Sequence, residues 1–361
     1  IEKDKERYEH KYEYCDLLVT GSGPAGLSSA YAAAKNGAKV ILAEDKPRFG
    51  GSLLTDDVTI DNLSGKAWSD KIITELKEMP NVIVKNRSQV FGYYDHNMMV
   101  MFEKTGDHLK DKPKYTPRQR LWYIRAKEVL LSTGSIERPI VFGNNDTPGI
   151  FLSAAAKEYM KVYGVLVGKK PLIFTNNDSA YETALEFKKQ GIESVIIDTR
   201  EEHSSELIDS AKNQNIQIKF SHAVIAANGY KKVKSAQIGK LNKDKTKFEN
   251  SEIIECDCIC VSGFWTPTVH LASQSGNKLK FNNQIDAFVP DKSKQKETSI
   301  GASKGTFTLK ETLAEGFKIG FDLSKNITNN NNSTSIPNSN ETKKSLHDKF
   351  WCSPLPKSKN Y

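Results

Sequence analysis

The chain has 361 residues, enough for two domains of ordinary size. Its apolar content of 38% and charged content of 27% indicate a globular protein, and no apolar run is long enough for a membrane span, so we predict no membrane partner. The net charge of +8 comes from scattered lysines, with loop clusters at 104–120 and 231–247, so we predict a solvated surface and no nucleic-acid partner.

The first thirteen residues are highly charged and lack the apolar centre of a signal peptide. They begin with Ile1, and we expect residues 1–13 to be a linker from an upstream domain of a longer chain. The chain has five cysteines, an odd number without the spacing of a disulfide framework. This usage favours a reducing compartment, and we predict a cytoplasmic location.

The stretch from Cys15 to Lys46 has the order strand, glycine turn, helix, strand and acid. The apolar run Cys15–Thr20 predicts a buried strand, and Gly21, Gly23 and Gly26 follow it as G-x-G-x-x-G. The first glycine permits a tight turn, the second lets a pyrophosphate approach the main chain, and the third lets the helix pack on the strand. The helix N-terminus would then point its N–H groups at the phosphates.

The second half of this unit supplies the acid that the motif requires. Gly37 ends the predicted helix, residues 39–43 form the second strand, and Glu44 follows directly. A carboxylate at this point accepts hydrogen bonds from an adenosine ribose. We therefore predict dinucleotide binding here; the alternative is a glycine-rich turn that serves packing alone.

A turn, a helix and several short strands are predicted to follow. Gly50, Gly51 and Ser52 form a flexible, hydroxyl-bearing turn, and residues 67–79 are predicted to be helical. Residues 82–85, 89–94 and 98–102 predict a small antiparallel meander, and 122–131 predicts a further strand. That strand ends in Ser132, Thr133 and Gly134, the point at which flavoproteins with two dinucleotide domains return to the nucleotide domain.

A second βαβ pattern follows, with a strand at 172–175, a helix at 179–189 and a strand at 194–198. Residues 175–180, TNNDSA, stand where the glycine turn would be. Their side chains would crowd a pyrophosphate, and the Asp178 carboxylate would repel it. We therefore predict that this second unit keeps the fold and binds no nucleotide.

Cys256, Cys258 and Cys260 lie within a predicted strand at 252–261, where alternation would place all three on one face. Zinc sites have a different spacing, so we predict core cysteines and no metal. The chain also lacks the C-x₂-C and C-x₄-C pairs of disulfide reductases, a nucleophile elbow and paired acids. We predict no catalytic residue in this chain.

The last part of the chain contains a predicted strand at 299–302, a helix at 309–323 and then an Asn- and Ser-rich stretch that we predict to be disordered. The predicted fold class is α/β, with two Rossmann-like βαβ domains of the FAD/NAD(P)-binding disulfide-reductase type, the second inserted in the first. The predicted boundaries are a linker at 1–13, a first dinucleotide-binding domain at 14–150, a ligand-free second domain at 151–265, a return to the first at 266–325, and a linker at 326–361.

Several specific motifs resemble the α subunit of heterotetrameric sarcosine oxidase. They are YEHKYEYCDLLVTGSGPAG at 8–26, GGSLL at 50–54, VFGYYD at 90–95, IRAKEVLLSTGSIERPIVFGNNDTPGI at 124–150, TNNDSAYE at 175–182, VSGFWTPTVHL at 261–271 and DAFVP at 286–290. The resemblance extends over residues 7–325. It is most specific in ERPIVFGNNDTPG and NNDSAYE, which a general disulfide reductase would lack.

The resemblance implies an α subunit that binds NAD and works with β, γ and δ subunits. The complex in that family oxidises sarcosine to glycine, passes electrons through FAD and FMN to oxygen, and gives hydrogen peroxide with formaldehyde or 5,10-methylenetetrahydrofolate. FAD lies on the β subunit and FMN at the α–β interface.

The resemblance also implies the residues that contact NAD. They are Ala25, Glu44, Asp45, Lys46, Ser52, Val90, Ala302, Phe307 and Leu309. The remaining candidates around the cofactor are Gly21, Gly23, Pro24, Gly26, Gly51, Thr133, Gly134 and Gly301. FAD-holding members of the fold usually carry an aspartate where this chain has Ala302, which favours NAD over FAD.

Two other functions stay open at this point. The chain could be the α subunit of a related flavin-dependent amine or proline dehydrogenase, or a self-sufficient FAD-dependent pyridine-nucleotide oxidoreductase. A structural subunit with an empty nucleotide site is a third alternative. The loop 137–149 is a candidate docking segment for a β-type partner, and a simple crossover between domains is the other interpretation.

Overall fold

The computed structural model describes residues 6–332, 335–339 and 347–354. The chain divides into two compact units, one from 1–135 and 266–343 and the other from 136–265 and 344–361. The second unit is therefore inserted in the first, as predicted, but it begins at Ile136 and not at residue 151. It begins earlier because Ile140 and Phe142 are buried in the core of the second unit.

The first unit is built on a seven-stranded sheet with the order β5-β2-β1-β8-β7-β6, in which β21 also pairs with β8. Strands β5, β2, β1 and β8 are parallel, whereas β8, β7 and β6 are antiparallel. The strand bounds are β1 Tyr8–Thr20, β2 Val40–Ala43, β5 Val82–Lys85, β6 Ser88–Tyr94, β7 Met98–Lys104, β8 Gln119–Leu131 and β21 Glu297–Ser299.

Three predictions for this sheet need correction. Residues 82–85 do not join the antiparallel meander, because β5 returns from helix α2 to lie parallel to β2. Part of the expected N-terminal linker belongs to β1, since Tyr8 already pairs with Gln119 of β8. The strand expected at 299–302 is β21 at 297–299, and a 3₁₀ turn, η4 Gly301–Lys304, follows it.

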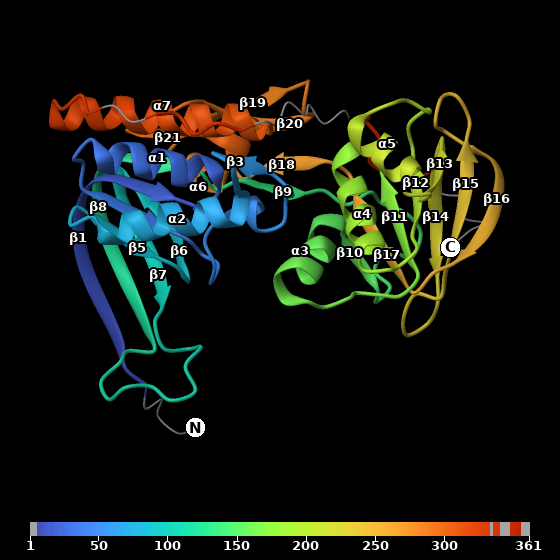
Figure 1. Ribbon diagram of the computed structural model, residues 1–361, viewed down its shortest axis with the longest axis horizontal. Helices are drawn as coiled ribbons and strands as arrows, with labels where there is room; N and C mark the ends of the chain where they lie inside the picture. The colour runs from blue at the N-terminus through green and yellow to red at the C-terminus, as the bar shows by residue number, and fades with distance from the viewer. Residues whose placement is uncertain (1–5, 333–334, 340–346, 355–361) are drawn as a thin grey trace. The chain divides into compact units, whose positions relative to one another are not determined.

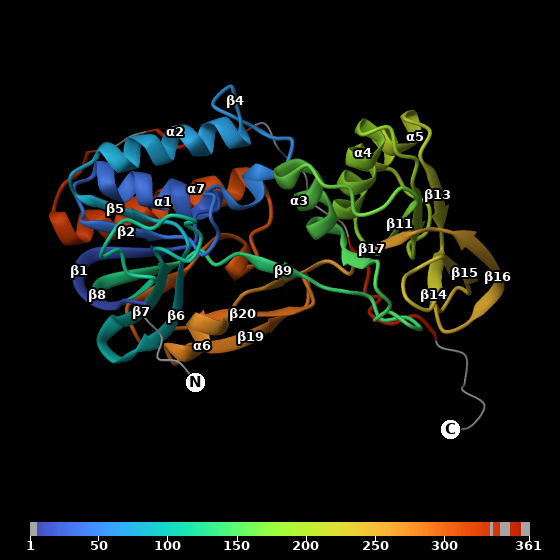
Figure 2. The same ribbon diagram turned by 90° about the horizontal axis from the view of Figure 1, so that it is seen from below.

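Helices α1 (Pro24–Lys35), α2 (Gly65–Glu78) and α7 (Leu309–Thr328) cover one face of this sheet, and the short α6 (His270–Gln274) packs on the other (Figure 2). Helices α1 and α7 lie side by side (Figure 1). Their close approach depends on Gly316 and Gly320, where a Cβ atom would lie 2.4 Å from the Ala25 oxygen and 2.3 Å from the Ser29 oxygen. No helix in the part of the chain that the structure describes is long and apolar enough to cross a membrane.

Smaller elements complete the first unit. They are η1 Gly51–Leu54, η2 Asp95–Asn97, and the pairs β3 Thr59–Ile60 with β4 Leu63–Ser64 and β19 Lys278–Asn282 with β20 Ala287–Lys292. Strands β9 (Ser135–Glu137) and β18 (Trp265–Pro267) form a further two-stranded sheet.

The second unit has three layers. Its central sheet is parallel, with the order β10-β17-β11-β12-β13, formed by β10 Ile150–Leu152, β11 Pro171–Thr175, β12 Val195–Asp198, β13 Gln217–Phe220 and β17 Cys258–Ser262. One face packs against α3 Ser153–Tyr163, α4 Tyr181–Lys189 and α5 Glu206–Asn213, with η3 Asp178–Ala180 before α4. The other face packs against the antiparallel strands β14 His222–Asn228, β15 Ser235–Leu241 and β16 Phe248–Glu255.

The single strand predicted at 252–261 is two strands, β16 and β17, which belong to different sheets. The break is fixed by Asp257, whose carboxylate accepts hydrogen bonds from the N–H groups of Lys169 and Lys170 at 2.8 and 2.7 Å. Cys256 therefore lies outside the strand that carries Cys258 and Cys260. All three thiols are free and buried, as predicted for core cysteines, and the described residues contain no cluster that could hold a metal ion.

Candidate functional site

The glycine turn after β1 is constrained by its backbone conformation and by close packing. Gly21 has φ +99°, and a Cβ atom there would lie 2.3 Å from the Ser132 carbonyl oxygen. A Cβ at Gly26 would lie 1.9 Å from the Gly21 oxygen. These contacts are far below van der Waals distance, so the fold itself requires glycine at both positions.

Gly23 differs from its two neighbours. A Cβ atom there would meet no protein atom within 4 Å, and its φ of −67° suits any residue. Neither packing nor backbone strain in the protein therefore requires glycine at this position. The open space lies at the start of α1, where Gly23 is the N-cap without a side-chain cap and Pro24 is the first helical residue. A phosphate group fits such a site, because the uncapped N–H groups of the first turn are donors without helical partners.

Glu44 lies directly beside this turn at the end of β2. Its carboxylate accepts hydrogen bonds from the N–H and hydroxyl of Ser22, at 2.8 and 2.6 Å, and from the N–H of Lys46 at 3.0 Å. Only 6% of Glu44 is exposed. Burial, followed by the adjacent Asp45 carboxyl group, raises the pKa of Glu44 to about 7. The predicted acid is thus held next to the glycine turn.

Two further predicted positions converge on the same turn. Gly51 has φ +56°, and a Cβ atom there would lie 2.9 Å from the Gly23 Cα. A Cβ at Gly301 would lie 2.9 Å from the Ala25 Cβ, so the residues before α7 reach the start of α1. The N–H of Gly301 donates to Glu315 at 2.8 Å. Ala302 follows without a carboxylate of its own.

The other predicted residues lie farther from the turn or engage other partners. The Thr133 hydroxyl donates to the Thr268 carbonyl at 2.9 Å, and the Gly134 carbonyl accepts from the Thr268 N–H. The Val90 side chain is buried in the core on the opposite face of the sheet from α1, and Leu309 lies in the core beneath α1. Asp45, Lys46 and Ser52 are exposed, and Ala302 and Phe307 are half-buried.

Sequence reasoning missed two residues of this site. Ser22 is the variable residue between the first two glycines; it donates to Glu44 and accepts hydrogen bonds from the Gly50 N–H. Glu315 lies in the second turn of α7, and its carboxylate binds both the Gly301 N–H and the Lys304 ammonium group. No motif in the sequence indicates either contact, because each joins segments that are distant in the chain.

The corresponding turn of the second unit is filled by its own side chains. Because Thr175 pairs with Asp198 as Thr20 pairs with Ala43, Asn176, Asp178 and Tyr181 stand in the places of Gly21, Gly23 and Gly26. The Tyr181 side chain is fully buried, and its hydroxyl donates to Asp198 at 2.7 Å.

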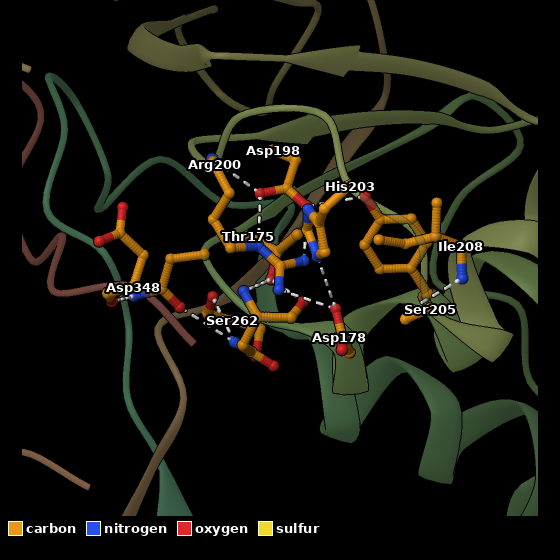
Figure 3. Close-up of polar contacts among 12 residues, drawn as sticks. Thr175, Asp178, Asp198, Arg200, His203, Ser205, Ile208, Ser262 and Asp348 are labelled. Atoms are coloured by element: carbon orange, nitrogen blue, oxygen red, sulfur yellow. Dashed lines mark hydrogen bonds and ion pairs between the residues drawn. The ribbon is translucent and has the colours of Figure 1, made fainter. Parts of the chain in front are cut away.

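A buried cation closes the polar cluster around this second turn. Figure 3 shows Arg200 between two carboxylates, donating to both oxygens of Asp198 at 2.9 and 2.7 Å and to Asp178 at 2.7 Å. The guanidinium group and both carboxylates are buried. The His203 Nε2 lies 3.6 Å from the same Asp178 oxygen. The guanidinium group therefore offsets part of the negative charge of the two carboxylates.

The loop at 137–149, a candidate docking segment, is anchored within the second unit. Asn144 has φ +57°, and its side-chain amide donates to the Ala227 carbonyl at 3.0 Å. The N–H of Gly143 donates to the Ile225 carbonyl, and Ile140 and Phe142 are buried. These contacts favour the interpretation of the loop as a packed crossover, although Asp146 is exposed.

Similarity to known proteins covers most of the chain. A family model described as pyridine nucleotide-disulphide oxidoreductase matches residues 15–300. The chain is 34% identical to sarcosine oxidase subunit alpha of Rhizobium meliloti (strain 1021), over 87% of this chain and 31% of the relative. It is 35% identical to the subunit of the same name from Corynebacterium sp. (strain P-1), over 88% of this chain and 33% of the relative.

These similarities confirm the resemblance inferred from the motifs. The chain spans about a third of the length of these curated relatives. Among solved structures, L-proline dehydrogenase from P. horikoshii superimposes with a TM-score of 0.67 at 21% identity, covering 88% of this chain and 57% of that one. That similarity confirms the α/β dinucleotide-binding fold.

Proposed function

We propose, from the premise that this chain belongs to the pyridine nucleotide-disulphide oxidoreductase family, that its first unit holds one NAD molecule as part of a multi-subunit amine oxidase. The observation that carries the proposal is the open space at Gly23 between two glycines that the fold itself requires. A glycine that neither packing nor strain requires is best explained by a ligand that approaches the main chain.

The residues of the site fit NAD in three places. The pyrophosphate would lie over Gly23 and the first turn of α1, and the adenosine ribose would donate its hydroxyl groups to Glu44. Each Glu44 carboxylate oxygen has two lone pairs, and Oε1 accepts from Lys46, so capacity remains for a ribose hydroxyl. Ala302 offers no carboxylate for a ribityl chain, which supports NAD over FAD.

We infer that the described residues of this chain do not perform the oxidation themselves. The five cysteines contain no redox pair, and the buried thiols of Cys15 and Cys256 have pKa values raised by burial to about 12, so they are protonated at neutral pH. We therefore propose that amine oxidation takes place on a β-type partner that carries FAD, with FMN at the interface with this chain, and that γ and δ subunits complete the complex.

For the complex we propose sarcosine as the substrate, supported by the two curated relatives described above. Glycine and hydrogen peroxide would be the products, with the one-carbon unit released as formaldehyde or transferred to tetrahydrofolate. A related proline or amine dehydrogenase is the alternative, supported by the shared fold of the solved L-proline dehydrogenase.

The experiment that tests the cofactor is release and identification of the bound nucleotide. The purified chain is denatured, and the supernatant is analysed by mass spectrometry and absorbance. We expect NAD at one molecule per chain and none from the Gly23→Val variant. FAD without NAD in the wild-type extract would instead support a self-sufficient flavin oxidoreductase, and no nucleotide at all would support a structural subunit.

A second experiment tests the division of labour. The chain alone should not oxidise sarcosine, and activity should appear on reconstitution with a β-type subunit that carries FAD. Turnover by the isolated chain would refute the proposed non-catalytic role, and activity with proline in place of sarcosine would support the alternative substrate.

A further inference from the structure

The parallel sheet of the second unit has a point where the strand order reverses, which we call the crevice, and its degenerate glycine turn leaves this point without an assigned use. Strands β11, β12 and β13 follow one another to one side, whereas β17 and β10 lie on the other side of β11. The order therefore reverses between β11 and β17, which end side by side at Thr175 and Ser262. Doubly wound sheets bind their ligands outside the carboxyl ends of the strands at this reversal.

A segment from the C-terminal part of the chain, residues 347–353, lies at this reversal point, and we call it the strap. The side-chain amide of Asn176 donates to the carbonyls of Asp348 and Phe350, at 2.8 and 3.2 Å. The Asp348 N–H donates to the Asn176 carbonyl at 2.9 Å, and Asn177 pairs with His347 as an antiparallel bridge. Figure 3 shows Asp348 beside the cluster of the second turn.

The strap also forms a parallel β-bridge with the loop at 137–149, between Cys352 and Val141. The Val141 N–H donates to the Trp351 carbonyl at 2.9 Å, and the Ser353 N–H donates to the Val141 carbonyl at 2.8 Å. This is the main-chain pattern by which extended peptides bind to a protein edge.

Four side chains of the strap make specific contacts with the second unit. The His347 ring stacks on Phe264 with ring centroids 3.9 Å apart and an interplanar angle of 6°. The Arg138 guanidinium group lies 3.9 Å above the Trp351 ring. Phe350 is 5% exposed and belongs to the hydrophobic core of the second unit. Lys245 forms an ion pair with Asp348.

We propose that the crevice of the second unit is a peptide-binding site whose resident occupant is the strap of the same chain, in the place where a doubly wound domain would hold a nucleotide. Asn176 is then a recognition residue, because its side-chain amide donates hydrogen bonds to two carbonyl groups of the strap. The Asp178–Arg200–Asp198 cluster lies at the same turn, where Arg200 holds the two carboxylates together. This inference extends beyond the NAD site and does not depend on it.

The test cuts the strap from the rest of the chain, which we call the body, after the chain has folded. A recognition sequence for a site-specific protease is inserted after Ser339 in the full chain, so that the bridge between Ile60 and Ser339 stays with the body. The folded chain is cut and passed over a size-exclusion column. We expect the released fragment to co-elute with the body, and the cut Asn176→Asp variant to retain it at least tenfold less well, because a carboxylate cannot donate to the two carbonyls.

Hydrogen exchange on the uncut chain gives a second readout. The amides of Val141, Asp348 and Ser353 should be protected in the wild type and exchange about tenfold faster in Asn176→Asp. Cys352→Ser is the matched control, since that side chain is exposed and its thiol donates only to the neighbouring Ser353 carbonyl among the bonds described, so it should behave as wild type. If circular dichroism shows that Asn176→Asp does not fold, Phe350→Ala provides the same two readouts.

Three results would overturn the proposal. The first is loss of the fragment from the cut wild-type chain. The second is equal retention by the wild type and both strap-site variants. The third is saturable binding of a second NADH to the uncut wild-type chain with no change in strap exchange, because the crevice would then have room for a nucleotide beside the strap.

Discussion

Replacing Gly23 with alanine should remove NAD binding and leave the fold intact. The new methyl group would meet no protein atom within 4 Å, and φ −67° is allowed for alanine. The entropic gain in the unfolded chain and the weaker N-cap nearly cancel, so we expect the free energy of unfolding to change by less than about 1 kcal/mol. The methyl group would instead occupy the space through which the pyrophosphate reaches the first turn of α1.

The magnitude of the binding defect follows from the hydrogen bonds that are blocked. A hydrogen bond to a charged group contributes about 1.5–3 kcal/mol, so losing two of them should weaken NAD binding by more than about a hundredfold. Isothermal calorimetry measures the affinity, and urea unfolding measures the stability. Gly26→Ala is the matched control, because its Cβ would lie 1.9 Å from the Gly21 oxygen and should destabilise the unit directly. NAD affinity of Gly23→Ala within threefold of wild type would refute the reasoning.

Three other perturbations test the remaining features. The pKa of Glu44 is raised to about 7, and ribose hydroxyl groups favour its charged form. NAD affinity should therefore fall about tenfold from pH 8 to pH 6 in the wild type and should not change in Glu44→Gln. An affinity of the wild type that does not depend on pH would contradict this role. The same raised pKa means that the Glu44 contribution to stability declines as pH rises from about 4.5 to 7. Arg200→Met removes the buried cation that pairs with two buried carboxylates and should lower the free energy of unfolding by about 3–5 kcal/mol in urea titrations; a loss below about 1 kcal/mol would contradict this. Gly316→Ala places a methyl group 2.4 Å from the main chain of α1 and should cost about 1–3 kcal/mol, and an unchanged thermal midpoint would show that α1 and α7 separate easily.

The first nucleotide unit could be predicted well because its signals are contiguous. Strand, glycine turn, helix and second strand follow one another within residues 15–43, and each depends on local backbone geometry. The positive φ of Gly21 and the close contact at Gly26 are consequences of that local path. The loss of the glycine turn at 175–180 could be predicted equally well, since the sequence shows which residues replace the glycines. Their NAD-binding and ligand-free roles stay predictions.

Predictions failed where a segment had a choice of distant partners. Residues 82–85 begin with the apolar, β-branched run of a strand, yet this pattern does not indicate whether the strand lies parallel to β2 or antiparallel to β6. Residues 252–261 read as one strand because apolar character continues through Cys256, although Asp257 diverts the chain from one sheet to another. The Asn- and Ser-rich composition predicted a disordered linker from residue 326, but α7 continues to Thr328 and the strap at 347–353 is packed on the second unit.

The sequence by itself therefore determined the fold class, the insertion of one unit in the other, and which of the two glycine turns is intact. Tertiary structure alone decided that Ser22 and Glu315 support the first site, that Arg200 joins Asp178 to Asp198, and that the strap lies in the second crevice. The physical reason is the separation along the chain between the residues that interact. Propensity and periodicity report the conformation of neighbouring residues, whereas contacts such as Asn176 with Asp348 join groups far apart in the chain and exist only once both segments have packed.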